Sequence, residues 1–225
     1  MRPRKDLRVL GDAAIQRFAR LRAEGDEATR PGSGLSVRDQ RALIAHCTVE
    51  LWATWHNFSR SLYLASAFRA RESAGRRVTL GITPPASEQE ALGVAIQRLK
   101  PRVYAAKGGV GPWNWRDEPR WMYPSQLLDS LVALQSSNLP AVQVALSNGT
   151  RTLQDLPEFR NFFAHRDVVT LRKAQSLFVH YGHPPTERPA GVLAVPSRTS
   201  QGTGWQPLLL DWVDDIVDAV TLAVL

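Results

Sequence analysis

The chain has 225 residues but only one cysteine, Cys47, so it cannot form an intrachain disulfide. Chains without a disulfide framework are typical of reducing compartments, and we expect a cytoplasmic protein. Cys47 lies within an apolar helical pattern, where a thiol stays protonated and unreactive. The sequence therefore predicts a core thiol at this position and not a nucleophile.

Long hydrophobic runs are also missing. The longest helical pattern, roughly residues 36–71, is interrupted by charged and polar side chains, and the chain starts with the charged stretch Met1-Arg-Pro-Arg-Lys-Asp6. A bilayer span needs about 20 apolar residues, and a secretory leader needs its own apolar stretch. We expect neither feature, and no membrane partner. Hydrophobic residues make up 44% of the chain, enough to bury the core of a single domain over residues 1–225.

Recognisable metal and nucleotide sites are scarce as well. The glycine-rich stretch Gly108-Gly-Val-Gly111 lacks the Gly-Lys-Ser/Thr that completes a phosphate-binding loop. The pair in His180-Tyr-Gly-His183 has no cysteine or acidic residue at the spacing of a metal site, and we interpret it as a helix end. The sequence predicts no metal and no cofactor.

Positive charge is concentrated in the first third of the chain. Residues 1–80 carry 15 Lys+Arg and 8 Asp+Glu, and the rest of the chain carries 13 of each, so the whole net charge of +7 lies in the first 80 residues. Such a field attracts polyanions, including RNA. The alternative is that an arginine-rich composition reflects genome bias and solubility, and the sequence leaves both interpretations open.

Apolar spacing predicts an all-α fold. We expect helices over 6–24, 36–71, 87–99, 124–135, 140–147 and 208–225. A further helix is expected to start at Asp155, and residues 168–181 are either its continuation or a separate helix. Ser36 and Ser87 are predicted helix caps, and Asn148-Gly149 a turn. Residues 76–122 are predicted to be an irregular insertion that begins with an extended segment. Residues 182–207 are predicted to be a loop with a short strand at 191–195.

Two further clusters have competing interpretations. The first combines tryptophans and arginines in the insertion: Trp113, Trp115, Trp121, Arg116 and Arg120. We favour tryptophans that anchor the insertion to the core over a platform for stacked bases. The second is an acidic stripe on the last helix: Asp211, Asp214, Asp215 and Asp218. We favour a solvated helix face, with a metal site or a contact to the basic N-terminal region as alternatives.

The stretch Arg160-Asn-Phe-Phe-Ala-His165 carries the strongest chemical signal. Arginine binds phosphate and histidine transfers protons near neutral pH, the two requirements for cutting RNA without a metal. With 24 arginines and five histidines, chance gives about half a match to this spacing, yet two occur, the second being Arg41-Ala-Leu-Ile-Ala-His46. The spacing alone therefore does not identify a site.

The surroundings favour the later motif. We predict that it lies near a helix start, with Asp155 as the N-cap and Pro157 in the first turn, where backbone N–H groups favour a phosphate. Asn161 and His165 are four residues apart and share a helix face, so the amide can orient the imidazole. The earlier motif has Ala42 at the corresponding position. Phe162 and Phe163 give the later motif apolar surroundings.

The two principal residues do not share a face. Five residues separate Arg160 and His165, about 140° on a helical wheel. One protomer does not easily direct both side chains at one phosphate, whereas a dimer that pairs two copies of this helix would. The plain structural alternative is a surface arginine beside a histidine at the edge of the core.

The motif resembles the R-N-x-x-A-H motif of the HEPN superfamily. The segment Val49-Glu-Leu-Trp-Ala-Thr-Trp-His-Asn-Phe58 also resembles the aromatic second helix of prokaryotic HEPN proteins of the RiboL-PSP type. The resemblance implies a HEPN-like helical bundle, a metal-independent endoribonuclease and a homodimer with facing motifs. It also implies a toxin or antiviral defence effector with an antitoxin or regulatory protein. Some HEPN toxins carry a modified tyrosine two residues after the histidine, where this chain has Asp167.

Carried over by position, the resemblance makes Arg160, Asn161 and His165 the catalytic residues. The RNA 2′-hydroxyl would attack the adjacent phosphorus, with His165 moving protons and Arg160 stabilising the phosphoryl oxygens. The products would be a 2′,3′-cyclic phosphate and a 5′-hydroxyl. Three further arginines, Arg166, Arg172 and Arg41, are candidate RNA-binding residues.

Two other functions remain open from the sequence. The first is a non-catalytic helical module that binds RNA or a protein partner through its basic first third. The second is a regulator that binds nucleotides at the same motif.

Overall fold

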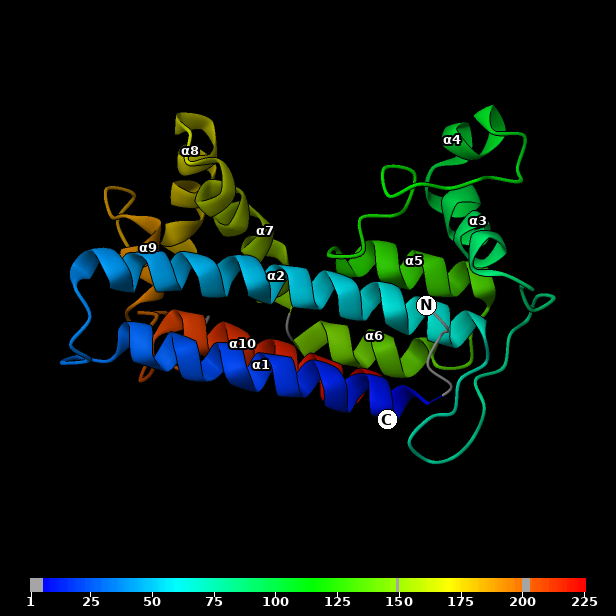
Figure 1. The fold of residues 1–225 in the computed structure, drawn as a ribbon, viewed down its shortest axis with the longest axis horizontal. Helices are drawn as coiled ribbons and strands as arrows, with labels where there is room; N and C mark the ends of the chain where they lie inside the picture. Colours follow the sequence, from blue (N-terminus) through cyan, green and yellow to red (C-terminus); the bar gives the residue numbers. More distant parts are fainter. Residues whose placement is uncertain (1–5, 149, 200–202) are drawn as a thin grey trace. The chain divides into compact units, whose positions relative to one another are not determined.

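The structure is a computed structural model that describes residues 6–148, 150–199 and 203–225. Within these ranges the chain forms α-helices, one short 3-10 helix and isolated bridges but no strand, which confirms the predicted all-α class (Figure 1). No helix in these ranges has both the length and the apolar character of a membrane span. The elements are α1 (Leu7–Thr29), α2 (Val37–Ala67), α3 (Glu88–Leu99), α4 (Pro101–Ala106), α5 (Pro124–Leu134), α6 (Leu139–Asn148), α7 (Thr150–His165), α8 (Val168–Leu177), η1 (Phe178–Tyr181), α9 (Pro189–Leu193) and α10 (Leu208–Ala223).

Both predicted serine caps hold their helices. The Ser36 hydroxyl accepts the backbone N–H of Asp39 at 3.2 Å and donates to the Asp39 carboxylate at the start of α2. Ser87 accepts the backbone N–H of Glu90 at 3.2 Å and caps α3. Each cap satisfies a backbone donor that a helix start leaves unpaired. Pro101 ends α3 as predicted, and it then occupies the first turn of α4, where its missing N–H is harmless.

The predicted loop 182–207 contains a helix. The predicted strand at 191–195 is wrong, because α9 occupies 189–193. Pro189 starts this helix, and Pro189, Ala190, Val192 and Leu193 are buried at helical and not alternating spacing. Within the insertion 76–122, α3 confirms the helix predicted at 87–99, and α4 is a further short helix that was not predicted. Gly149 of the predicted Asn148-Gly149 turn lies outside the described residues.

The chain divides into two units. The first comprises residues 1–14, 55–148 and 219–225, and the second comprises residues 15–54 and 149–218. Helices α1, α2 and α10 contribute residues to both units. Each unit has its own buried apolar set, so each is described by itself below.

In the first unit, tryptophans attach the insertion to α2. Trp121 is fully buried, and its ring lies 4.9 Å from that of Tyr63. Trp55 donates its indole N–H to the carbonyl of Met122 at 3.0 Å. Trp113 is also buried, in contact with α3 at Gly93, where a Cβ atom would lie 3.2 Å from the indole nitrogen. The anchoring role is therefore confirmed for Trp113 and Trp121, whereas Trp115 is 77% exposed.

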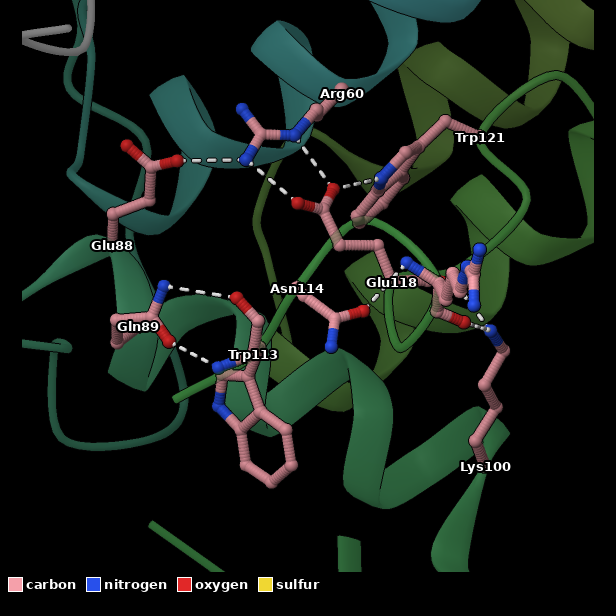
Figure 2. Close-up of polar contacts among 9 residues, drawn as sticks. Arg60, Glu88, Gln89, Lys100, Trp113, Asn114, Glu118 and Trp121 are labelled. Carbon is pink, nitrogen blue, oxygen red and sulfur yellow. Dashed lines mark hydrogen bonds and ion pairs between the residues drawn. The ribbon is translucent and has the colours of Figure 1, made fainter. Parts of the chain in front are cut away.

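A polar network fastens the same insertion. Figure 2 shows Arg60 of α2 between two carboxylates, with Glu118 at 2.6 Å from its Nε and Glu88 at 2.7 Å from its Nη2. Glu118 also accepts the indole N–H of Trp121 at 2.9 Å. The hydrogen bond to Glu118, more than the opposing effect of burial, raises the pKa of Arg60. Because Glu118 is largely buried, this pair ties the end of the insertion to the core.

The second unit has an aromatic core built around α7. The ring of Phe159 meets that of Trp212 edge to face at 5.0 Å and lies 5.7 Å from that of Phe178. The ring of Tyr181 also packs against Trp212, in a tilted arrangement with 5.9 Å between the ring centroids. Edge-to-face and tilted pairs at these separations are the favoured aromatic geometries. They fix α7, η1 and α10 to one another.

The acidic stripe of α10 is not a solvated face, so that prediction is wrong for most of its members. Asp211 is buried and accepts the side chains of Thr203 and Gln206, while Asp214 pairs with Arg22 of α1 at 2.8 Å. Only Asp218 of the four is exposed. The alternative of a contact to the basic N-terminal helix is therefore confirmed at Arg22 and Asp214.

Candidate functional site

The motif Arg160–His165 occupies the last turns of α7, and its predicted place near a helix start is wrong. The helix begins at Thr150 and ends at His165, so Asp155 and Pro157 lie inside it. The buried positions Leu153, Leu156 and Phe159 continue the apolar face upstream of the predicted start. The positive end of the helix dipole is therefore about 15 Å from Arg160, too far to assist phosphate binding there.

Arg160 is held by an aromatic ring of α2. Its guanidinium carbon lies 4.4 Å from the ring centroid of Trp52, a distance typical of a cation–π contact. Its Nη1 donates to the side-chain oxygen of Asn161 at 3.2 Å. Its Nε is buried and has no hydrogen-bond partner among the described residues. The guanidinium is thus fixed in orientation and has a hydrogen-bond donor that no described residue uses.

The structure joins Arg160 to Asn161 but does not join either residue to His165. His165 is exposed at the last position of α7, and no hydrogen bond links it to Asn161 in the described part of the chain. The side-chain carbonyl oxygen of Asn161 instead accepts a hydrogen bond from Arg160. The predicted orienting contact between amide and imidazole is therefore absent from a single protomer.

A sharp turn follows the histidine. Arg166 has a φ of 54°, in the left-handed region that non-glycine residues rarely occupy, and its N–H donates to the Phe162 carbonyl at 2.7 Å. Asp167 then caps α8 by accepting the backbone N–H of Thr170 at 2.8 Å, and this hydrogen bond lowers the pKa of its carboxyl. Asp167, two residues after the motif, therefore acts as the N-cap of α8.

The other candidate residues are spread over the second unit. Arg41 lies exposed on α2, Arg166 at the turn and Arg172 exposed on α8, and their proposed contact with RNA stays a prediction. His46 of the earlier Arg-x4-His pair lies 3.6 Å from Glu24, and no aromatic ring among the described residues lies over Arg41. The later motif is therefore distinguished by the stacked arginine.

Trp52 is the residue that sequence reasoning did not assign to the site. It belongs to the aromatic segment 49–58 that supported the family resemblance, but nothing local indicated that it faces an arginine more than a hundred residues later. The signal that the sequence offers is a tryptophan at the edge of the apolar face of an amphipathic helix. It becomes informative only when α2 and α7 are known to be neighbours.

Cys47 and His183 are both buried. Cys47 is buried, and burial, reinforced by the charge of Glu24, raises its pKa to about 12, in agreement with the predicted core thiol. His183 is buried beside Glu187, with 3.2 Å between its Nδ1 and the carboxylate oxygen. Across the described ranges, no group of three or more histidine, cysteine and acidic side chains has the arrangement of a metal site.

Asp155 has a different role from the predicted cap. It is buried within α7 and accepts hydrogen bonds from two residues of η1, the Tyr181 hydroxyl at 2.9 Å and the His180 ring at 3.1 Å. Sequence reasoning assigned none of these residues to a common cluster, because 25 residues separate Asp155 from His180.

No protein-family model matches this chain, and neither a curated protein nor a solved structure resembles it significantly. Its function must therefore be inferred from its own residues.

Proposed function

We propose that this chain is a metal-independent endoribonuclease of the HEPN type, with Arg160, Asn161 and His165 as its catalytic residues. One observation carries the proposal: the Arg160 guanidinium is stacked on Trp52 and hydrogen-bonded to Asn161, five residues before an exposed histidine. An arginine in a structural role normally pairs with a carboxylate, as Arg22 and Arg60 do here. Among the described residues no carboxylate pairs with Arg160, which supports a phosphate as its partner.

The proposed reaction needs only these side chains. His165 takes the proton from the 2′-hydroxyl, the 2′-oxygen forms a bond to phosphorus, and the bond to the 5′-oxygen breaks. The leaving oxygen receives a proton from an imidazolium, and Arg160 offsets charge on the phosphoryl oxygens. Because Arg160 and His165 are not joined within one protomer, we propose that two copies of the chain pair their α7 helices to complete each site.

Such an activity would be harmful in a cell unless restrained. We therefore propose a toxin or defence effector in a reducing, cytoplasmic setting, controlled by an antitoxin or regulatory protein. A second candidate, a non-catalytic RNA-binding module, draws support from the exposed arginines Arg17, Arg20, Arg38 and Arg41 on α1 and α2. This alternative predicts RNA binding that is lost when these arginines are neutralised and is unaffected at His165.

Product chemistry provides the direct test. Purified protein is incubated with a mixed RNA pool in excess EDTA, and the product ends are typed by mass spectrometry. We expect 2′,3′-cyclic phosphate and 5′-hydroxyl ends, with a DNA pool of the same sequences left intact because it lacks the attacking 2′-hydroxyl. Products with 5′-phosphate ends, or cleavage that EDTA abolishes, would contradict the mechanism.

Trp52→Ala should weaken catalysis without removing a catalytic group. Loss of a cation–π contact of about 0.5–2 kcal/mol releases the guanidinium, so we expect about 3- to 30-fold slower cleavage, mainly in kcat. Trp52→Phe should retain most of the rate. The control is Trp205→Ala, since Trp205 is an exposed tryptophan of the same unit. Equal rates for Trp52→Ala and Trp205→Ala would show that the stacking does not position Arg160.

A further inference from the structure

A second cluster of ionisable groups lies on α7, away from the motif. The Asp155 carboxylate accepts the Tyr181 hydroxyl at 2.9 Å and the Nδ1 of His180 at 3.1 Å, both on the same oxygen. The guanidinium of Arg151, one helical turn before Asp155, lies 3.9 Å from the other carboxylate oxygen and 3.3 Å from the Nδ1 of His180. Burial, together with the Asp155 charge, raises the pKa of Tyr181, so its hydroxyl stays a donor.

Nδ1 of His180 has two neighbours that need opposite tautomers, since the Arg151 guanidinium can only donate to it and the ionised Asp155 carboxylate can only accept from it. The contact to Asp155 is the shorter of the two, at 3.1 Å against 3.3 Å, and we place the hydrogen on Nδ1, pointing to Asp155. The arginine then lies beside Nδ1 and does not donate to it. The Nε2 atom, on the far side of the ring from the carboxylate, remains for a ligand. A carboxylate that fixes Nδ1 in this way is the arrangement that orients an imidazole for proton transfer or anion binding.

The backbone of His180 is fixed as well. Its carbonyl accepts the Thr199 hydroxyl at 2.6 Å, and the carbonyl of Tyr181 accepts the N–H of Arg198 at 2.9 Å. Gly182, with a φ of 74°, closes η1 in a left-handed conformation. The imidazole is thus held at its ring by α7 and at its backbone by residues 198–199. This rigidity keeps its orientation before any ligand arrives.

The cluster is open on one side. The side chain of Asp155 is 4% exposed, whereas those of His180 and Arg151 are 28% and 41% exposed. The bond from the buried Tyr181 to Asp155 already links η1 to α7 and satisfies the carboxylate oxygen. The guanidinium of Arg151 and the ring of His180 therefore both reach solvent from a carboxylate that is itself buried.

We propose that Arg151 and His180 form a phosphate-binding site that is separate from the Arg160–His165 motif, with Asp155 as its positioning residue. The guanidinium of Arg151 and Nε2–H of the protonated His180 bind the oxygens of a phosphate group, and Asp155 holds the opposite ring nitrogen. Nine residues separate Arg151 from Arg160, which places them on opposite sides of α7, about 13 Å apart along its axis. The site does not depend on the proposed nuclease activity.

The test observes His180 directly in the His165→Ala protein, which keeps RNA intact if the nuclease proposal is right. Two-dimensional 15N–1H spectra of the histidine side chains should show His180 with hydrogen on Nδ1, and inorganic phosphate should shift its Nε2 resonance in a saturable way. A hydrogen on Nε2 in place of Nδ1 in the neutral ring, or no saturable shift, would overturn the proposal.

Variants and ligands then refine the result. Arg151→Gln should weaken phosphate binding about tenfold, the loss of one hydrogen bond to a charged group, and Arg102→Gln, at an exposed position of α4, should not change it. Equal effects of the two variants would overturn the site. Tighter binding of a 3′-mononucleotide than of phosphate-linked RNA with hydroxyl ends identifies a terminal phosphate as the ligand. The reverse order identifies the RNA backbone, and either order supports the site.

Discussion

Replacing His165 with alanine is expected to slow RNA cleavage by about 10²- to 10⁴-fold, the usual contribution of a general acid–base group. The imidazole is exposed at the end of α7 and makes no hydrogen bond with Arg160 or Asn161, so its removal should not disturb the fold. The measurement is the initial rate of cleavage of an end-labelled RNA in EDTA. Thermal unfolding of wild type and variant should coincide.

His46→Ala is the matched control for this experiment. His46 has the same spacing from an arginine and is also exposed, but it faces Glu24 and not a stacked guanidinium. We expect its rate to equal that of the wild type. Full activity in His165→Ala would place the active site elsewhere. Equal loss in both variants would point to a general effect on the protein and remove the support for the motif.

Arg60→Ala should produce the largest loss of stability in the first unit. The substitution removes the cation that pairs with the Glu118 carboxylate, whose side chain is 12% exposed. The carboxylate then keeps the hydrogen bond from the Trp121 indole. Removing one member of a largely buried ion pair costs about 2–4 kcal/mol after allowance for the partial exposure of Arg60. In a chain of this size the midpoint of thermal unfolding should fall by about 5–15 °C.

Two variants separate this effect from simple loss of charge. Arg8→Ala breaks an exposed pair with Asp12 in the same unit and should cost less than about 0.5 kcal/mol. The double variant Arg60→Met with Glu118→Gln leaves no unpaired carboxylate at 118 and keeps an acceptor for Trp121, so it should recover part of the loss. If Arg60→Ala were as stable as Arg8→Ala, the network would not anchor the insertion.

Local chemistry accounts for the features that could be predicted from the sequence. Ser36 and Ser87 cap helices because their hydroxyls reach backbone N–H groups three residues away, and Pro101 ends a helix through its own ring. The all-α class follows from apolar spacing over long segments. The start of α7 was mispredicted because Asp155 has the chemistry of a cap, but its carboxylate is used by Tyr181 and His180.

The candidate site could be predicted only in part, because its contacts are not local. The six-residue motif identified Arg160, Asn161 and His165, and the contact between the first two is between neighbours. The stacking on Trp52 joins residues 52 and 160, and the partner of His180 lies 25 residues earlier. Helix periodicity places such residues on a face, but it does not say which faces meet. Packing around Phe159 and Trp212 determines that.

Pro157 divides α7 into two halves, although the helix runs without a break from Thr150 to His165. Proline has no N–H to donate to the Leu153 carbonyl, so the ladder of backbone hydrogen bonds is interrupted in the middle of the helix. The turns before it are tied to η1 and α10 through Asp155 and Thr152, while the turns after it carry Arg160 to His165. Amide hydrogens of the later turns should therefore exchange with solvent through openings that leave the earlier turns protected. The half of α7 that holds the motif can therefore open locally while the other half stays folded.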